Sequence, residues 1–160
     1  MNKIPVINIS TLLLIITLLL LLPIKKAKAM LKPDYSALKA EIIKLVNRHR
    51  DSLHLAPLTS HSLAGAEAQK HTENMANKTT QFGHDGFSNR VQAIRKKEKE
   101  ATGFGENVAF GAKTAQEVFQ MWLNSPDHRK NIEGNFTHIG IGIAASKAGT
   151  LYYTQIFVKL

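Results

Sequence analysis

The stretch from Gly103 to Ile132 constrains the fold more than any other part of the chain, because it contains two well-marked helix starts within thirty residues. Thr114 opens a T-A-Q-E box, in which the threonine hydroxyl caps a helix that Glu117 closes from inside. Ser125 is followed by Pro126, a residue that favours the first position of a helix. The stretch therefore predicts two short helices in succession, and Ser125 is expected to cap the second.

Two ionisable side chains accompany these helix starts. Glu106 follows Gly105 and begins an apolar run that ends before Gly111, and this run is too short for a helix. Glu106 is therefore expected at the edge of a strand. His128 lies on the second predicted helix, so its imidazole and the Glu106 carboxylate can face one cleft.

Helical periodicity dominates the residues before this stretch. Apolar residues from Leu38 to Leu53 recur on one face of a predicted helix, with lysines and arginines outside that face. Ser60 is expected to cap a second helix, whose inner face is rich in alanine as far as Met75 and so permits close packing against another layer. Ser88 is expected to cap a third helix, from Asn89 to about Lys99.

The pattern changes to period two near the C-terminus. From Phe136 to Ala144, isoleucines occupy one face of a predicted strand, and Gly140 and Gly142 occupy the other, where another element must approach closely. The segment from Thr150 to Val158 is apolar on both faces, as in the central strand of a covered sheet. Together these patterns predict an α+β fold, with helices on both sides of a small, mainly antiparallel sheet.

The N-terminal residues have the features of a secretory signal peptide. Lys3 precedes an apolar run from Thr11 to Leu22, and the small residues Ala27 and Ala29 suit a signal peptidase. A retained membrane anchor would need about 18 to 20 apolar residues, and this run is shorter. We therefore expect residues 1–29 to be removed and residues 30–160 to form a single secreted domain without a membrane span, outside the cell or in its envelope.

Composition excludes several kinds of site and partner. The chain has no cysteine, which excludes disulfides, thiolate metal sites, a cysteine nucleophile and a lipid anchor on cysteine. Four of the 21 basic residues lie within residues 1–29, which leaves 17 basic against 12 acidic residues and a net charge of +5. The densest basic run, from Arg95 to Lys99, contains no aromatic residue for base stacking, so nucleic acid is not an expected partner.

Six short motifs follow one another after residue 46 with compatible spacing. They are Asn47-x-x-Arg50, His71-x-x-Asn74-Met75-Ala76, Gly83-His84, Gly105-Glu106-Asn107-Val108-Ala109, Trp122-x-Asn124-Ser125-Pro126-x-His128-Arg129-x-Asn131-Ile132 and Ile139-Gly140-Ile141-Gly142. In this order the motifs resemble the CAP superfamily, which groups cysteine-rich secretory proteins, antigen 5 and pathogenesis-related 1 proteins, and in particular its small bacterial branch. The resemblance covers essentially the whole chain after residue 29 and implies the family's three-layer α-β-α sandwich.

The resemblance also implies a central cavity lined by two histidines and two acidic residues, in which the histidines can hold a divalent cation such as zinc. The histidines correspond to His84 and His128, the acid of the G-E-N motif corresponds to Glu106, and Asn107 follows it as a supporting residue. Ser125 stands where eukaryotic members have the second acid. The implied cavity residues are therefore His84, Glu106, Ser125 and His128, and the pair of carboxylates is incomplete.

These cavity residues admit two interpretations. In the first, His84, His128 and Glu106 hold zinc and leave a fourth position open to water, whose pKa the metal lowers towards neutrality. In the second, Glu106 accepts structural hydrogen bonds from backbone amides, the histidines bond locally, and the protein has no cofactor.

Three further residues are expected to support the site. His71 lies on an apolar helix face, where a histidine is more often a hydrogen-bonded core residue than a ligand. Asn47 and Arg50 lie on one side of a helix, and Arg50 can tie that helix to the sheet through a carboxylate such as Glu106. Arg90, by contrast, is expected to be a surface or capping cation.

Three functions compete. The first is a secreted interaction module, whose cavity holds a metal or small ligand and whose partner is an unidentified protein or small molecule outside the cell. The second is a metal-dependent hydrolase of peptide or cell-wall bonds, with zinc-bound water as nucleophile and Glu106 as general base. The third is lipid or sterol carriage, which the resemblance implies only through eukaryotic members with cysteine-braced loops. The sequence leaves open whether the protein is an enzyme.

Overall fold

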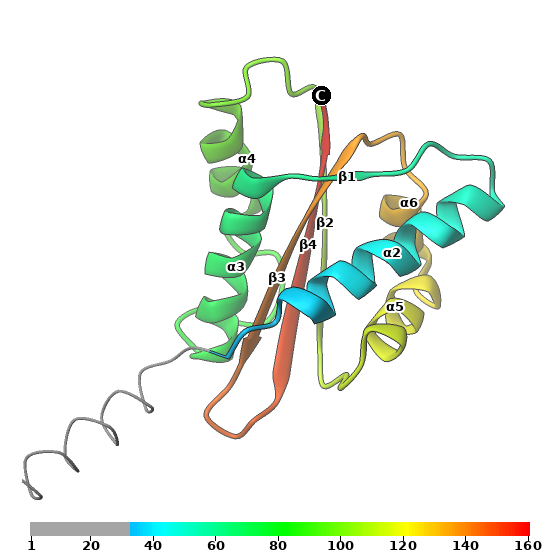
Figure 1. The fold of residues 1–160 in the computed structure, drawn as a ribbon. Coiled ribbons are helices and arrows are strands. Elements are labelled where there is room, and N and C mark those ends of the chain that lie inside the picture. Colours follow the sequence, from blue (N-terminus) through cyan, green and yellow to red (C-terminus); the bar gives the residue numbers. More distant parts are fainter. Residues whose placement is uncertain (1–32) are drawn as a thin grey trace, which may run out of the picture. The chain divides into compact units, whose positions relative to one another are not determined.

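A four-stranded sheet lies between two layers of helices in the computed structural model, which describes residues 33–160 (Figure 1). The strands are β1 (Thr59–Ser60), β2 (Gly103–Phe110), β3 (His138–Ala145) and β4 (Leu151–Lys159), in the spatial order β1-β3-β4-β2. Strand β4 pairs antiparallel with both β3 and β2, whereas the short β1 is parallel to β3. The predicted α+β fold with a mainly antiparallel sheet is confirmed. The predicted signal peptide, residues 1–29, lies outside the described residues.

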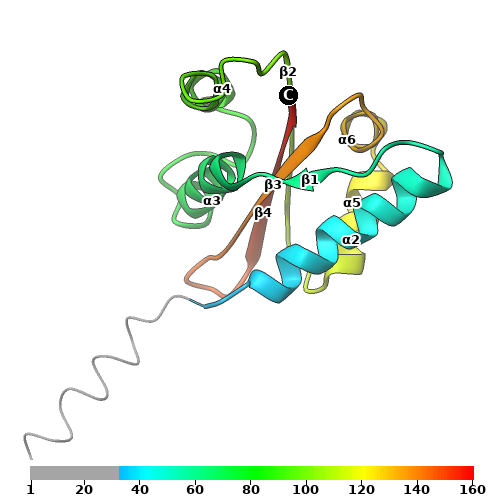
Figure 2. The ribbon, with the colours of Figure 1, turned by 45° about the horizontal axis from the view of Figure 1, so that its top comes forward.

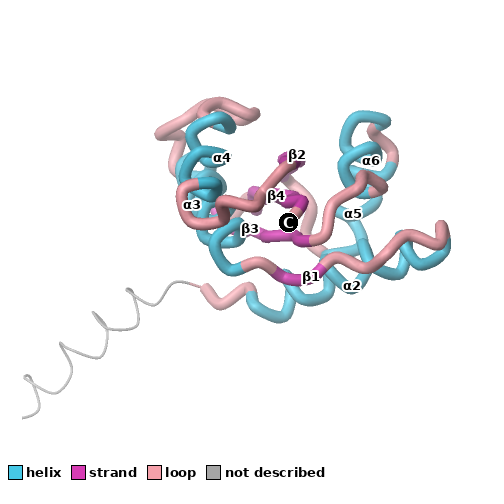
Figure 3. Tube along the Cα trace, turned by 90° about the horizontal axis from the view of Figure 1, so that it is seen from above, coloured by secondary structure: helices cyan, strands magenta, loops and turns pink. Residues whose placement is uncertain are grey.

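The helices divide between the two faces of this sheet. Helices α3 (Ser62–Ala76) and α4 (Phe87–Arg95) cover one face, and α2 (Ser36–Ser52), α5 (Ala115–Leu123) and α6 (Pro126–Ile132) lie on the other, as Figure 3 shows. In Figure 2, α2 lies across α5, with which it packs. The three-layer α-β-α arrangement is therefore present. None of the helices between residues 33 and 160 is both long and apolar enough to cross a membrane.

Each face of the sheet has its own buried cluster. On the α2 side, Trp122 from α5 packs with Tyr153 and Phe157 from β4, and all three are fully buried. On the α3 side, Ile156 from β4 packs with Ile94 from α4. Side chains of β4 are thus buried on both faces, which confirms the prediction of a central strand near the C-terminus.

The two helix starts of the 103–132 stretch are where they were predicted. The Thr114 hydroxyl accepts a hydrogen bond from the Glu117 amide at 3.1 Å and so caps α5. The Glu117 carboxylate in turn accepts from the Lys113 amide at 2.6 Å. Ser125 occupies the N-cap position of α6 ahead of Pro126, but its hydroxyl makes no capping hydrogen bond. The position of the second cap is confirmed, and its expected hydrogen bond is absent.

Two other predicted caps were wrong, because neighbouring residues take their place. Ser60 pairs with Ile139 as part of β1, and α3 is instead capped by the next residue, His61, whose Nδ1 accepts from the Ala64 amide at 3.1 Å. Ser88 lies inside α4, which begins after Gly86 and ends at Arg95 rather than near Lys99. Gly86 has a φ of 75°, a left-handed conformation that suits glycine and turns the chain into the helix.

The alternating glycines of β3 allow α3 to lie directly on the sheet. A Cβ atom built at Gly140 would lie 2.2 Å from the backbone nitrogen of Gly65 in α3, and one at Gly142 would lie 2.3 Å from the Ala68 carbonyl oxygen. On the opposite face of β3, Ile139 belongs to the buried cluster under α2. The predicted close approach at the glycines is therefore confirmed, and its partner is the backbone of α3.

This contact predicts opposite effects for two facing glycine-to-alanine substitutions. Gly140→Ala should destabilise the protein by at least about 1–3 kcal/mol, because the new methyl group must displace helix backbone rather than a flexible side chain. Gly65→Ala is the matched control, because its Cβ would meet only the Gly140 Cα at 4.0 Å and alanine favours a helix by about 0.5–1 kcal/mol over glycine. Urea unfolding measures both, and wild-type stability in Gly140→Ala would contradict the packing.

Candidate functional site

A buried carboxylate, Glu106, lies at the centre of the candidate site. It is in the middle of β2, one of the two edge strands of the sheet, rather than at the edge of a strand as predicted. Only 5% of the residue is exposed. Arg90 of α4 binds it through two parallel hydrogen bonds, from Nε to Oε2 and from Nη2 to Oε1, each 2.7 Å long. A buried carboxylate needs such a partner, and this bidentate geometry is the strongest that arginine offers.

The expectation that Arg90 is a surface or capping cation was wrong. Its residue is 8% exposed, and besides Glu106 it donates from Nη1 to the Asp85 carbonyl at 2.9 Å. Arg90 therefore binds both the carboxylate of β2 and the loop that leads into α4. The only signal in the sequence was indirect, since a buried Glu106 requires a cation and several arginines were available.

That loop carries His84, which shares the carboxylate with Arg90. The Nδ1 atom of His84 lies 3.0 Å from Oε1 of Glu106, and about half of the imidazole is exposed. A carboxylate can only accept hydrogen bonds, so Nδ1 carries the proton, and Nε2 keeps a lone pair when the ring is neutral. The hydrogen bond thus selects the tautomer in which Nε2 can bind a ligand.

His128 reaches the site from α6 on the other side of β2. Its imidazole is partly buried, which lowers its pKa, and the nearby His84 lowers it further against a smaller opposing effect of Asp127. The neutral imidazole is the form that binds metals. Asn107 holds this helix by donating from its side chain to the His128 carbonyl at 3.0 Å. The predicted pair of histidines is therefore brought to one edge of the sheet.

The remaining residues of α6 strengthen this attachment. Asn131 donates to the Glu106 carbonyl at 3.1 Å and to the Asn107 side chain at 2.8 Å. Ser125, the fourth predicted cavity residue, forms backbone hydrogen bonds at the start of α6 and none with His84, Glu106 or His128 within the described residues. Asn131 was part of a recognised motif, but its role as a clamp on β2 was not predicted.

The site does not assemble three uncommitted metal ligands. Across residues 33–160, no group of three or more histidine, aspartate or glutamate side chains has an arrangement that could hold a metal ion. Both oxygens of Glu106 already accept hydrogen bonds from Arg90, so the donor atoms that remain are the imidazole nitrogens of His84 and His128. Glu106 is placed to orient His84, as the outer carboxylates of many metal sites orient a histidine ligand.

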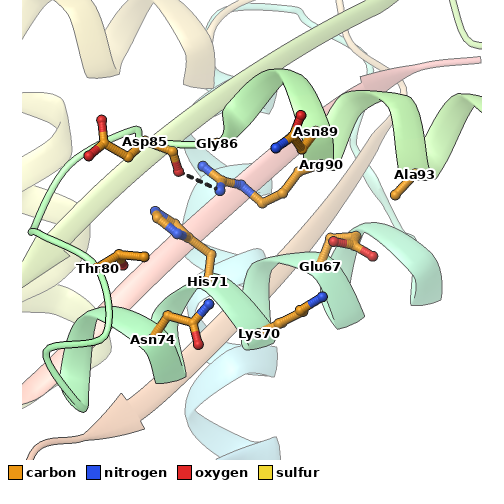
Figure 4. A pocket seen from close by; sticks show the side chains of 10 residues that line it. All are labelled: Glu67, Lys70, His71, Asn74, Thr80, Asp85, Gly86, Asn89, Arg90 and Ala93. Atoms are coloured by element: carbon orange, nitrogen blue, oxygen red, sulfur yellow. Dashed lines mark hydrogen bonds between the residues drawn. The ribbon is translucent and has the colours of Figure 1, made fainter.

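A polar cleft of about 290 Å³ lies behind Arg90, between α3 and α4 (Figure 4). His71 points into this region from α3, is 3% exposed, and donates from Nε2 to the Gly83 carbonyl at 2.8 Å. Burial is the main cause that lowers the pKa of His71. Its position agrees with the expected hydrogen-bonded core role, and the bond to Gly83 helps to position the loop that carries His84.

Arg50 and Asn47 have scaffold contacts far from the carboxylate. The expected bond between Arg50 and Glu106 was wrong, because the buried Arg50 donates instead to the carbonyls of Ala56, Ile132 and Gly134 at 2.8–2.9 Å. These carbonyls belong to the loop after α2, to the last residue of α6 and to the loop that follows α6, whereas Glu106 is bound by Arg90 of α4. The Asn47 side chain forms two hydrogen bonds with the backbone of Leu58, at 2.9 and 2.8 Å.

Comparison with known proteins identifies the family. A model of the cysteine-rich secretory protein family, CAP, matches residues 43–157. The chain belongs to the CAP family. Uncharacterized protein YkwD of Bacillus subtilis (strain 168) is 33% identical over 127 residues, which are 78% of this chain and 48% of that protein. The chain thus spans about half the length of this relative.

Solved structures of other bacterial proteins share the fold. An outer surface protein from Borrelia burgdorferi has a TM-score of 0.71 at 21% identity, over 81% of this chain and 97% of that one. An extracellular protein containing an SCP domain from Bacillus anthracis has a TM-score of 0.63 at 26% identity, over 78% of this chain and 41% of that one. The three-layer sandwich of this chain is therefore the CAP sandwich, as the motifs implied.

The ion pair between Arg90 and Glu106 predicts that removing the charge of Glu106 alone strongly destabilises the protein. Glu106→Gln keeps the shape of the side chain but leaves the buried Arg90 without a counter-charge, so stability should fall by about 3–5 kcal/mol. The control is Glu41→Gln, which breaks exposed ion pairs with Lys44 and Arg48 and should change stability by less than about 1 kcal/mol. Urea unfolding compares the two, and equal midpoints would refute a buried Arg90–Glu106 pair.

The buried neutral His71 predicts that stability falls with acidity. Its pKa in the folded protein lies below the ordinary 6.5, so the unfolded chain takes up a proton first as the pH drops. The contribution of neutral His71 to the free energy of unfolding is therefore intact above about pH 7. It is lost as the pH falls through about 6.5 towards the pKa of His71 in the folded protein. His71→Gln, which can still donate to Gly83, should flatten the decline of melting temperature between about pH 7.5 and about pH 5. An identical decline in both proteins would exclude His71 as its source.

Proposed function

We propose that this CAP protein is a binding module that acts outside the cell and holds a divalent metal such as zinc between His84 and His128. The observation that carries the proposal is the 3.0 Å hydrogen bond from His84 Nδ1 to Glu106, which leaves Nε2 of this half-exposed side chain as the nitrogen that can bind a ligand. The neutral state favoured at His128 supports the same use. Water molecules would complete the coordination of the metal.

Several features support a location outside the cell. The N-terminal 29 residues have the pattern of a cleaved signal peptide, and we infer that residues 30–160 are the exported protein. The Borrelia burgdorferi relative is described as an outer surface protein and the Bacillus anthracis relative as extracellular. We extend that location to this chain.

The contacts of Glu106 favour binding over the alternative of a metal-dependent hydrolase. A general base must accept a proton from the attacking water, and a side chain with 1% exposure has little access to water. Both of its oxygens also form 2.7 Å hydrogen bonds with Arg90, which a proton on the carboxylate would weaken. Catalysis by Glu106 would therefore require the ion pair to open first.

Calorimetric titration of zinc into the metal-stripped protein tests the proposal. We expect one saturable site in the wild type, and His84→Ala and His128→Ala should each weaken it by at least about tenfold, because each removes a ligand. The control is His54→Asn, since His54 is exposed on a loop and its φ of 58° is one that asparagine tolerates.

Two results would overturn this proposal. One is the absence of saturable zinc binding in the wild type, and the other is equal affinity in the wild type, His84→Ala and His128→Ala. Cleavage of a peptide or cell-wall substrate by the zinc-loaded protein, with loss of cleavage in folded Glu106→Gln, would replace the binding module with the hydrolase.

A further inference from the structure

Three aromatic side chains form an exposed cluster at one end of the sheet. Phe82 lies on the loop that carries His84, Phe110 ends β2 and Tyr152 lies near the start of β4. The rings of Phe82 and Phe110 are 4.8 Å apart, and those of Phe110 and Tyr152 stack at 5.6 Å. Phe82 and Phe110 are each 47% exposed. Exposed, clustered aromatic residues on a folded domain commonly mark a binding surface.

A shallow groove of about 560 Å³ continues from Phe110 along α5. In Figure 1 the chain turns from the end of β2 into α5 at this place. Three side-chain amides line the groove, those of Gln116, Gln120 and Asn124. Their spacing of four residues places them on one side of α5, about 6 Å apart along its axis. All three residues are exposed, and their amides form no side-chain hydrogen bond within the described part of the chain.

The groove offers several hydrogen-bonding side chains and little charge. Among the described residues that line it, the one ionisable side chain is Glu117, and one oxygen of that carboxylate accepts from the Lys113 amide at 2.6 Å. The groove beside α5 therefore carries one negative charge, although the chain has a formal net charge of +9. Three neutral amides beside one carboxylate favour an uncharged, hydroxyl-rich ligand over an anion, because an amide both donates to and accepts from a hydroxyl group and the carboxylate repels negative charge.

An extended peptide is a poorer fit for the same place. Although β2 is the outer strand of the sheet, its carbonyl oxygens at Glu106 and Val108 already accept from the side chains of Asn131 and Trp122. These two side chains cover the strand edge on which a peptide would add as another strand. A ligand in the groove therefore meets side chains, namely aromatic ring faces and amides, rather than a free backbone edge.

We propose that this groove binds a neutral polysaccharide chain. The aromatic cluster supplies ring faces on which the C–H face of a sugar can stack, and the row of amides supplies a hydrogen-bonding pair for about each successive sugar unit. Of the aromatic cluster, Phe82 comes from the loop that also carries His84. The groove is separate from the metal site, because it is lined by the end of β2, the turn after it and α5, and none of these residues is a proposed metal ligand. The two sites can therefore succeed or fail independently.

Nuclear magnetic resonance titration of the purified protein with chitotetraose and cellotetraose tests the proposal. At least one of these neutral oligosaccharides should shift the side-chain amide signals of Gln116, Gln120 and Asn124 in a saturable way. Phe110→Ala and Gln120→Ala should each weaken the binding by about tenfold or more. Leu53→Ala is the matched control, because Leu53 is 45% exposed and lies outside the groove, so its affinity should equal that of the wild type.

The same titration identifies the outcomes that would overturn the proposal. One is that neither neutral oligosaccharide binds. Another is that Phe110→Ala and Gln120→Ala bind the sugars with unchanged affinity. The third is that tetragalacturonate or an uncharged apolar peptide, rather than the neutral sugars, binds at these amides. Zinc titration of Phe110→Ala keeps the two proposals distinguishable, since the metal site should bind as in the wild type even where the sugar site is lost.

Discussion

The ion pair between Arg90 and Glu106 connects most parts of the candidate site. It joins the outer strand of the sheet to α4, and through the Asp85 carbonyl it also attaches the loop that carries His84. Because the pair is buried, neither charge can be lost without leaving the other unpaired in a medium of low polarity. The position of His84 therefore depends on the ion pair between α4 and β2, because His84 binds the same Glu106 carboxylate as Arg90.

The Glu106 side chain both stabilises the fold and orients a residue of the candidate site. The carboxylate satisfies the guanidinium and at the same time orients the imidazole, so the same atoms that stabilise the fold select the tautomer of His84. On the opposite side of β2, Asn107 and Asn131 attach α6 and bring His128 to the strand. The sheet edge thus holds two histidines from opposite layers, and neither layer alone contains the site.

Local features of the sequence predicted much of the architecture. The Thr114 cap and Pro126 correctly indicated the starts of α5 and α6, and the alternating glycines of β3 correctly indicated where another element approaches the sheet. These features depend on residues within a few positions of one another, or on a missing side chain, and so can be read without knowledge of distant contacts. The ordered motifs likewise identified the CAP sandwich, because they represent a whole fold rather than a single element.

The partners of charged and polar side chains, in contrast, could not be predicted from local features of the sequence. The sequence by itself determined which arginines were available to pair with Glu106 and suggested Arg50, but only the tertiary structure decided that Arg90 binds the carboxylate while Arg50 binds backbone carbonyls. The same holds for His61 as the cap of α3 and for the exposed cluster around Phe110. Such choices depend on which side chains the packing of layers brings within about 3 Å, and long-range packing leaves no local pattern in the sequence.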